Sequence, residues 1–101
     1  MSYTYWLHEK IQKDLNEGFT WYEERRTGLG YEFLQAIENT ISEIIAHPEV
    51  YGSKGNPDFR EALIKRFPYV IVYRIYKRKK EIFISAVHHT KKFPREKYRR
   101  P

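Results

Sequence analysis

The chain contains no cysteine, so neither a disulfide bond nor a thiolate metal ligand can contribute to its structure. This absence is typical of proteins from a reducing compartment, and we expect a cytoplasmic location. No apolar run approaches the roughly 18 residues that a transmembrane helix needs, and the first residues lack the pattern of a secretory signal peptide. The sequence therefore predicts a soluble protein without a membrane partner.

Internal repeats and low-complexity tracts are also absent. A length of 101 residues is typical of one domain, and we treat residues 1–101 as a single unit. A chain of this size can bury about 65% of its unfolded surface, which supplies one core without disulfides or metals.

Acidic residues are scarce in the second half of the chain. Residues 1–53 hold 4 Lys/Arg and 9 Asp/Glu, whereas residues 54–101 hold 15 Lys/Arg and 4 Asp/Glu. The whole chain carries a formal net charge of +6. This asymmetry favours an anionic partner, either nucleic acid or an acidic protein segment. The alternative is a basic surface that is simply solvated.

The composition of a buried strand appears in one long stretch, Arg60–Tyr76. Its last seven residues are β-branched or aromatic except for Arg74, and such side chains fit a pleated, half-buried surface. A short candidate strand precedes this run and another follows it, with turns at Arg66-Phe67 and Lys77–Lys80. We predict three consecutive antiparallel strands with the middle one central, over Glu61–Lys65, Val70–Tyr76 and Ile82–Val87.

The first half of the chain shows helical periodicity after a short strand at Ser2–Leu7. Apolar residues recur at Ile11, Leu15, Phe19 and Tyr22, and again at Phe33, Ile37, Ile41, Ile44 and Ile45. The short link Thr27–Gly30 between the two stripes predicts an antiparallel helical hairpin, and His47-Pro48 ends the second helix.

These elements predict an α+β fold of order β-α-α-β-β-β, in which the helical hairpin packs on one face of an antiparallel sheet. The core is expected to contain Ile11, Leu15, Phe33, Ile37, Ile41, Ile71 and Tyr73.

The histidines do not suggest a metal site. His88 and His89 are adjacent, so on a strand they point to opposite faces, and no cysteine supports them. We expect no metal and no other cofactor. His, Tyr, Lys and Arg can nevertheless provide a base, an acid and positive charge for RNA cleavage without a metal.

Four segments carry recognisable motifs, and together they cover nearly the whole chain. They are DLNEGFTWYEER, LGYEFLQAIENTISEIIAHPEVY, FREALIKRFPYVIVYRI and ISAVHHTKKFP. The order of the WYE, HP-x-x-Y, FPY-x-I-x-Y and H-x-x-K-x-P features resembles the RelE/ParE superfamily of type II toxin–antitoxin toxins. The FPY strand and the H-x-x-K-x-P ending resemble the ParE-like branch more than the RelE-like branch.

The resemblance implies a toxin that arrests growth and is neutralised by a cognate antitoxin. ParE-like toxins with an assigned target poison DNA gyrase, whereas RelE-like toxins cleave mRNA on the ribosome. RelE-like sequences often place a catalytic Arg just after the Tyr of the central strand, where this chain has Val70. The resemblance therefore favours gyrase inhibition without enzymatic activity over RNA cleavage.

Family antitoxins are acidic and partly disordered before they bind. They then lay a helix over the hairpin and often add a strand to the sheet. For binding of the target or the antitoxin we predict Arg60, Lys65, Arg66, Arg74, Lys91, Lys92 and Arg95. For the alternative RelE-like endonuclease we expect His88, His89, Lys91, Lys92, Tyr98 and Arg60 to act. A third interpretation is a non-toxic module that binds nucleic acid through its basic half.

Overall fold

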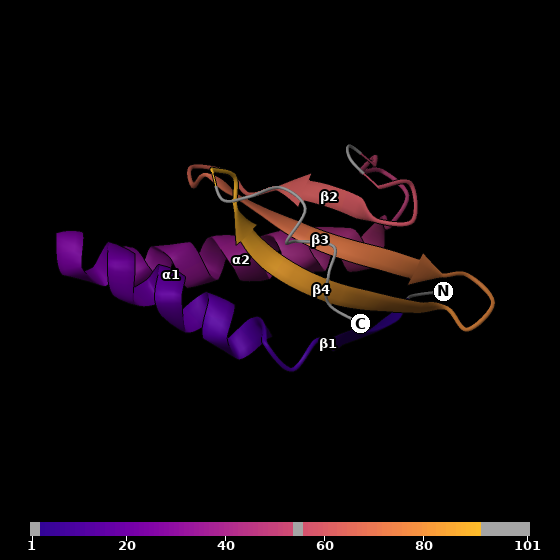
Figure 1. Cartoon of the computed structure of the whole chain (residues 1–101), viewed down its shortest axis with the longest axis horizontal. Coiled ribbons are helices and arrows are strands. Elements are labelled where there is room, and N and C mark those ends of the chain that lie inside the picture. The colour runs from indigo at the N-terminus through magenta and orange to yellow at the C-terminus, as the bar shows by residue number, and fades with distance from the viewer. Residues whose placement is uncertain (1–2, 54–55, 92–101) are drawn as a thin grey trace.

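The computed structural model describes residues 3–53 and 56–91. It contains β1 (Thr4–Leu7), α1 (Ile11–Arg25), α2 (Leu29–Ala46), β2 (Arg60–Leu63), β3 (Tyr69–Tyr76) and β4 (Glu81–His89). The two helices form an antiparallel hairpin that lies across one face of the sheet (Figure 1). The predicted α+β class and element order are confirmed. Within the described ranges, neither helix has the length and apolarity needed to cross a membrane.

The sheet has the strand order β1-β4-β3-β2. Strands β2, β3 and β4 form the predicted antiparallel meander, with β3 between the other two. Strand β1 instead pairs in parallel with β4, from Thr4 opposite Glu81 to Leu7 opposite Ile84. The sheet is therefore mixed rather than antiparallel throughout. No tight turn joins β1 to β4, so the local sequence does not fix the direction in which this edge strand pairs.

The predicted core is confirmed. Ile11, Phe33, Ile37, Ile71 and Tyr73 are all buried in one cluster between the hairpin and the sheet. Leu15 and Ile41 are half-buried and pack against that cluster. The Tyr73 hydroxyl donates a 2.6 Å hydrogen bond to the Pro48 carbonyl. Burial raises the pKa of Tyr73 to about 12, so this donor keeps its proton near neutral pH.

The two helices make close contact at glycine. A Cβ atom on Gly18 of α1 would lie 2.5 Å from the Phe33 ring of α2, and one on Gly30 would lie 2.8 Å from the Phe19 carbonyl oxygen. Both distances are shorter than a carbon atom tolerates, so a larger residue would push the helices apart. Gly18 therefore fixes the separation of the helices, at the price of a lower helix propensity.

The face of the sheet turned away from the helices is apolar as well. Phe59, Val70, Val72 and Ala86 form a second buried cluster there, and Trp6 stacks on Phe83 with ring centroids 4.1 Å apart. Apolar groups on both faces explain why the β3 sequence is nearly continuous in hydrophobic residues instead of alternating with polar ones.

Candidate partner-binding and target-binding surfaces

A groove of about 540 Å³ opens between α1 and α2 and reaches Tyr5 of β1. Its apolar lining comes from Leu15, Phe19, Leu34, Ile37, Ile41 and Ile45, and polar side chains such as Gln12 and Glu38 complete the wall. The hairpin contributes these residues because its apolar stripes are wider than the contact with the sheet requires. The helical stripes predicted a core, and they gave no sign that some of the same side chains also line this hairpin groove.

Strand β1 forms an exposed edge of the sheet beside the hairpin groove. Tyr5, Trp6 and Leu7 remain 47%, 47% and 44% exposed. The Thr4 amide donates to the Lys80 carbonyl just before β4, and the His8 amide donates to the Ile84 carbonyl within β4. Successive backbone groups of a strand point in alternate directions. The amides of Tyr5 and Leu7 therefore point away from β4, where an added strand can pair with them.

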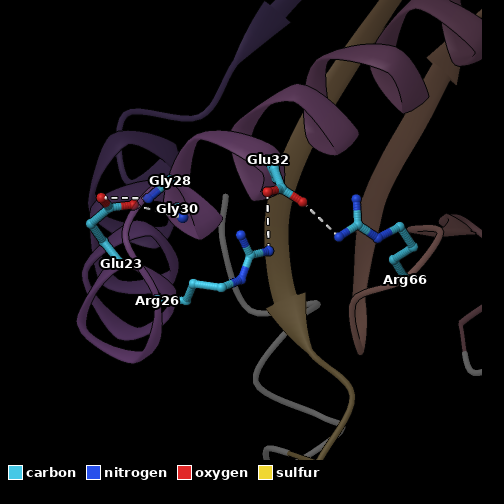
Figure 2. A network of polar contacts seen from close by, with 6 residues as sticks. All are labelled: Glu23, Arg26, Gly28, Gly30, Glu32 and Arg66. Atoms are coloured by element: carbon cyan, nitrogen blue, oxygen red, sulfur yellow. Dashed lines mark hydrogen bonds and ion pairs between the residues drawn. The ribbon is translucent and has the colours of Figure 1, made fainter.

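The turn between the helices is held by carboxylates rather than by a capping residue of its own. Glu23 of α1 accepts hydrogen bonds of 2.9 Å from both the Gly28 and the Gly30 amides at the start of α2 (Figure 2). Gly28 has a left-handed backbone with φ of 92°, which glycine adopts without strain. Glu23 thus satisfies two amides that a helix start leaves without intrahelical partners.

Replacing Glu23 by alanine is expected to lower the free energy of unfolding by about 1–2 kcal/mol, because two amides lose their acceptor. Urea denaturation of the purified protein measures this loss. The matched control is Glu24→Ala, since Glu24 is the exposed neighbour on the same helix, and its effect is expected within about 0.5 kcal/mol of zero. Equal losses in the two variants would contradict the capping role of Glu23.

Glu32 joins the helical hairpin to the sheet. Its carboxylate accepts from Arg26 at 3.0 Å and from Arg66 at 2.7 Å (Figure 2). Both hydrogen bonds lower the pKa of Glu32, and the one from Arg66 has the larger effect. Arg66, a predicted binding residue, has a left-handed φ of 74° in the β2–β3 turn. With the exposed Lys65 it borders a second groove of about 470 Å³ between α2 and β2.

Two further predicted cations lie against the protein itself. The Arg60 guanidinium donates to the Tyr51 and Glu49 carbonyl oxygens at 2.6 and 3.3 Å, which holds the chain between α2 and β2. Arg74 is half-buried, and its guanidinium carbon lies 5.3 Å from the ring centroids of both Phe59 and Tyr76. These contacts give both arginines a structural role in the free protein.

The predicted histidines lie at the end of β4. His88 pairs opposite Val70, and His89 pairs opposite Tyr69 with ring centroids 5.1 Å apart. Directly opposed residues share a face of the sheet, so the two histidines occupy opposite faces. The exposed Lys91 donates its amide to His89 Nδ1 at 3.0 Å.

Arg60 lies apart from the other described members of the predicted nuclease set, His88, His89 and Lys91. Arg60 lies opposite Tyr73. Tyr73 is four positions along β3 from Tyr69, the partner of His89, which places Arg60 roughly 13 Å along the sheet from that pair. Arg60 also shares the helix-facing side with Tyr73, whereas His88 shares the other side with Val70. The remaining predicted residues, Lys92, Arg95 and Tyr98, lie outside the described part of the chain.

The position expected to hold a catalytic Arg in a RelE-like nuclease is apolar and enclosed. Val70 is 7% exposed and packs in the cluster with Phe59, Val72 and Ala86. Among residues 3–53 and 56–91, no three His, Asp or Glu side chains are arranged to hold a metal ion.

The fold has solved relatives. The chromosomal ParDE toxin–antitoxin system from P. aeruginosa contains a chain with a TM-score of 0.76 at 17% identity, over 88% of this chain and 97% of that one. The isolated E. coli RelE toxin has a TM-score of 0.65 at 17% identity, over 95% of this chain and 93% of that one. The RelBE2 toxin–antitoxin complex from Mycobacterium tuberculosis contains a chain with a TM-score of 0.63 at 18% identity, over 88% of this chain and 99% of that one. The fold is therefore that of the RelE/ParE superfamily of toxins.

The sequence match is more specific. The family model for the ParE toxin of the type II toxin-antitoxin system parDE matches residues 5–93. The chain belongs to this family of ParE toxins, as its resemblance to the superfamily predicted. No curated protein sequence matches the chain.

Proposed function

We propose that this toxin acts in the cytoplasm, arrests growth by inhibiting DNA gyrase and is neutralised by a cognate antitoxin that occupies the hairpin groove. The observation that carries the antitoxin part is the hairpin groove beside the exposed edge of β1. An apolar groove between two helices accepts the apolar face of a third helix, and an open edge accepts a strand. Among the solved relatives, the P. aeruginosa ParDE structure is of a toxin–antitoxin system and the M. tuberculosis RelBE2 structure is of a toxin–antitoxin complex.

Charge supports an acidic antitoxin segment. The chain has a net charge of +6, so it attracts an acidic, disordered tail before apolar contacts form. Binding then orders the tail and buries apolar surface, which produces a negative heat-capacity change. The attraction weakens as salt screens exposed charges.

Membership of the ParE family supports gyrase as the target. The buried Val70 adds to this support, because an aliphatic side chain cannot stabilise the charge of a pentacoordinate phosphate. Loss of one such electrostatic contact typically costs on the order of 10²–10³ in rate. The alternative remains ribosome-dependent cleavage of mRNA by His88, His89 and Lys91 with residues beyond the described part.

Two assays separate these targets. Purified toxin is expected to reduce gyrase supercoiling of plasmid DNA, or to trap cleaved plasmid, and to leave mRNA intact on translating ribosomes. Addition of the antitoxin should reverse the effect on gyrase. Mapped mRNA cleavage in the ribosomal A site that disappears in His88→Ala or Tyr98→Ala would instead establish the RelE type of activity. Growth arrest with neither effect would reject both targets.

A further inference from the structure

The turn between β3 and β4 consists of four consecutive cations, Lys77, Arg78, Lys79 and Lys80, here called the basic turn. All four side chains are exposed. The turn is tight, because the Lys80 amide donates to the Lys77 carbonyl oxygen at 3.3 Å. Lys80 also has a left-handed φ of 52°, a conformation that Gly or Asn adopts at lower cost in hairpin turns. Backbone geometry and charge repulsion therefore both disfavour lysine at this turn.

The protein neutralises little of this charge. Lys77 pairs with Glu49 at 2.9 Å, but the two side chains are 66% and 57% exposed, so the pair is weak and exchanges readily with another anion. Among the described residues, Arg78, Lys79 and Lys80 take part in no ion pair.

The basic turn projects at the end of the sheet opposite the α1–α2 turn, away from the span of the hairpin (Figure 1). The helices carry exposed carboxylates, including Glu17, Glu24, Glu38 and Glu43. An extended polyanion is repelled by the helical layer and attracted to the basic turn, so the distribution of charge orients its approach. The lining of the hairpin groove comes from Tyr5 and the two helices and includes no residue of the basic turn.

We propose that the basic turn binds the phosphate backbone of duplex DNA. Protein–protein interfaces are depleted in Lys and centre on apolar anchors, and the basic turn contains no apolar residue. Protein–DNA interfaces are polar and strongly positive, and duplex DNA offers one negative charge per ~1.7 Å of its axis. Cations on a short turn make contacts with phosphates that do not depend on sequence. This contact is independent of the target proposed above.

The test is a salt titration of the full chain against a fluorescent DNA duplex of about 20 base pairs, followed by anisotropy. Each phosphate contact contributes about −0.9 to the slope of log K against log salt. The double substitution R78S/K79S is expected to reduce the slope by about 1.8 and to weaken binding on the order of 10²-fold at ~50 mM salt. The swap R78K/K79R retains both charges and is expected to retain the slope.

The matched control, K10S/K13S, also removes two positive charges. Lys10 directly precedes α1, and Lys13 lies in its first turn. Both lysines are exposed, and this variant is expected to keep the slope within about 0.3 of the parent. Equal losses in the two variants would show that binding follows net charge and would overturn the proposal. It would also be overturned by the absence of salt-dependent duplex binding, or by competition from poly-glutamate as effective as that from unlabelled duplex. Thermal melts establish that each variant is folded.

Discussion

Replacing Phe33 by alanine is expected to lower the free energy of unfolding by about 3–5 kcal/mol, the usual cost of removing a buried aromatic ring. Phe33 is 0% exposed. Its ring centroid lies 5.3, 5.5 and 4.9 Å from those of Tyr22, Phe67 and Tyr69. The ring therefore joins both helices to the β2–β3 turn and β3. The Gly18 backbone also lies against the ring, and glycine has no side chain that could move into the cavity.

Denaturant melts of Phe33→Ala measure this loss. The control is Val50→Ala, which removes apolar atoms from a side chain that is 72% exposed and is expected to cost less than about 0.5 kcal/mol. Ile37→Ala should fall within about 2–5 kcal/mol, with Ile41→Ala at the lower end because its side chain is only half-buried. A loss near zero for Phe33→Ala would refute the core assignment.

The second large effect concerns the hairpin groove. Replacing Leu34 and Ile45 together by alanine is expected to raise the Kd for the antitoxin about 100-fold or more, because each replacement removes apolar contact from the lining of the proposed interface. Both side chains are half-buried and line the hairpin groove. Isothermal titration calorimetry measures the affinity, and the heat-capacity change should become less negative since less apolar surface is buried.

The matched control is the pair Leu63→Ala and Val50→Ala. These side chains are apolar and exposed, at 59% and 72%, and lie outside the hairpin groove. Their removal is expected to change the Kd by less than about threefold. In cells, the antitoxin should fail to rescue growth from the Leu34/Ile45 variant but should rescue the control. Equal loss of affinity in both pairs would place the antitoxin elsewhere on the toxin.

The sequence predicted the main elements because each had a clear local signal. The stripes of α1 and α2 recur at helical spacing, and β3 is composed almost entirely of β-branched and aromatic residues. The prediction of an antiparallel sheet was wrong for β1, which pairs in parallel with β4. The two strands are far apart in the chain, so no local sequence pattern indicates the direction of their pairing. The contact of Gly18 with Phe33 was missed for the same reason, as it depends on how two helices cross.

Candidate surfaces were harder to predict than the fold. Charge identified Arg60, Arg66 and Arg74 as binding residues, but a sequence does not show that Arg60 also holds backbone carbonyls or that Arg66 pairs with Glu32. Hydrophobicity identified Leu15 and Ile41 as core, whereas they also line the hairpin groove. Whether a half-buried side chain leaves one side exposed depends on how the helices pack. The periodic pattern of apolar residues along a helix does not show this.

The parallel pairing of β1 with β4 has a consequence for synthesis of the chain. Strand β1 emerges from the ribosome first, and its neighbour begins only at Glu81. At ~5–20 residues per second, this interval lasts on the order of ten seconds, so the sheet can close only after β4 has been synthesised. Strand β4 also lies between β1 and β3. A product that terminates before Glu81 therefore lacks the strand that joins the two parts of the sheet.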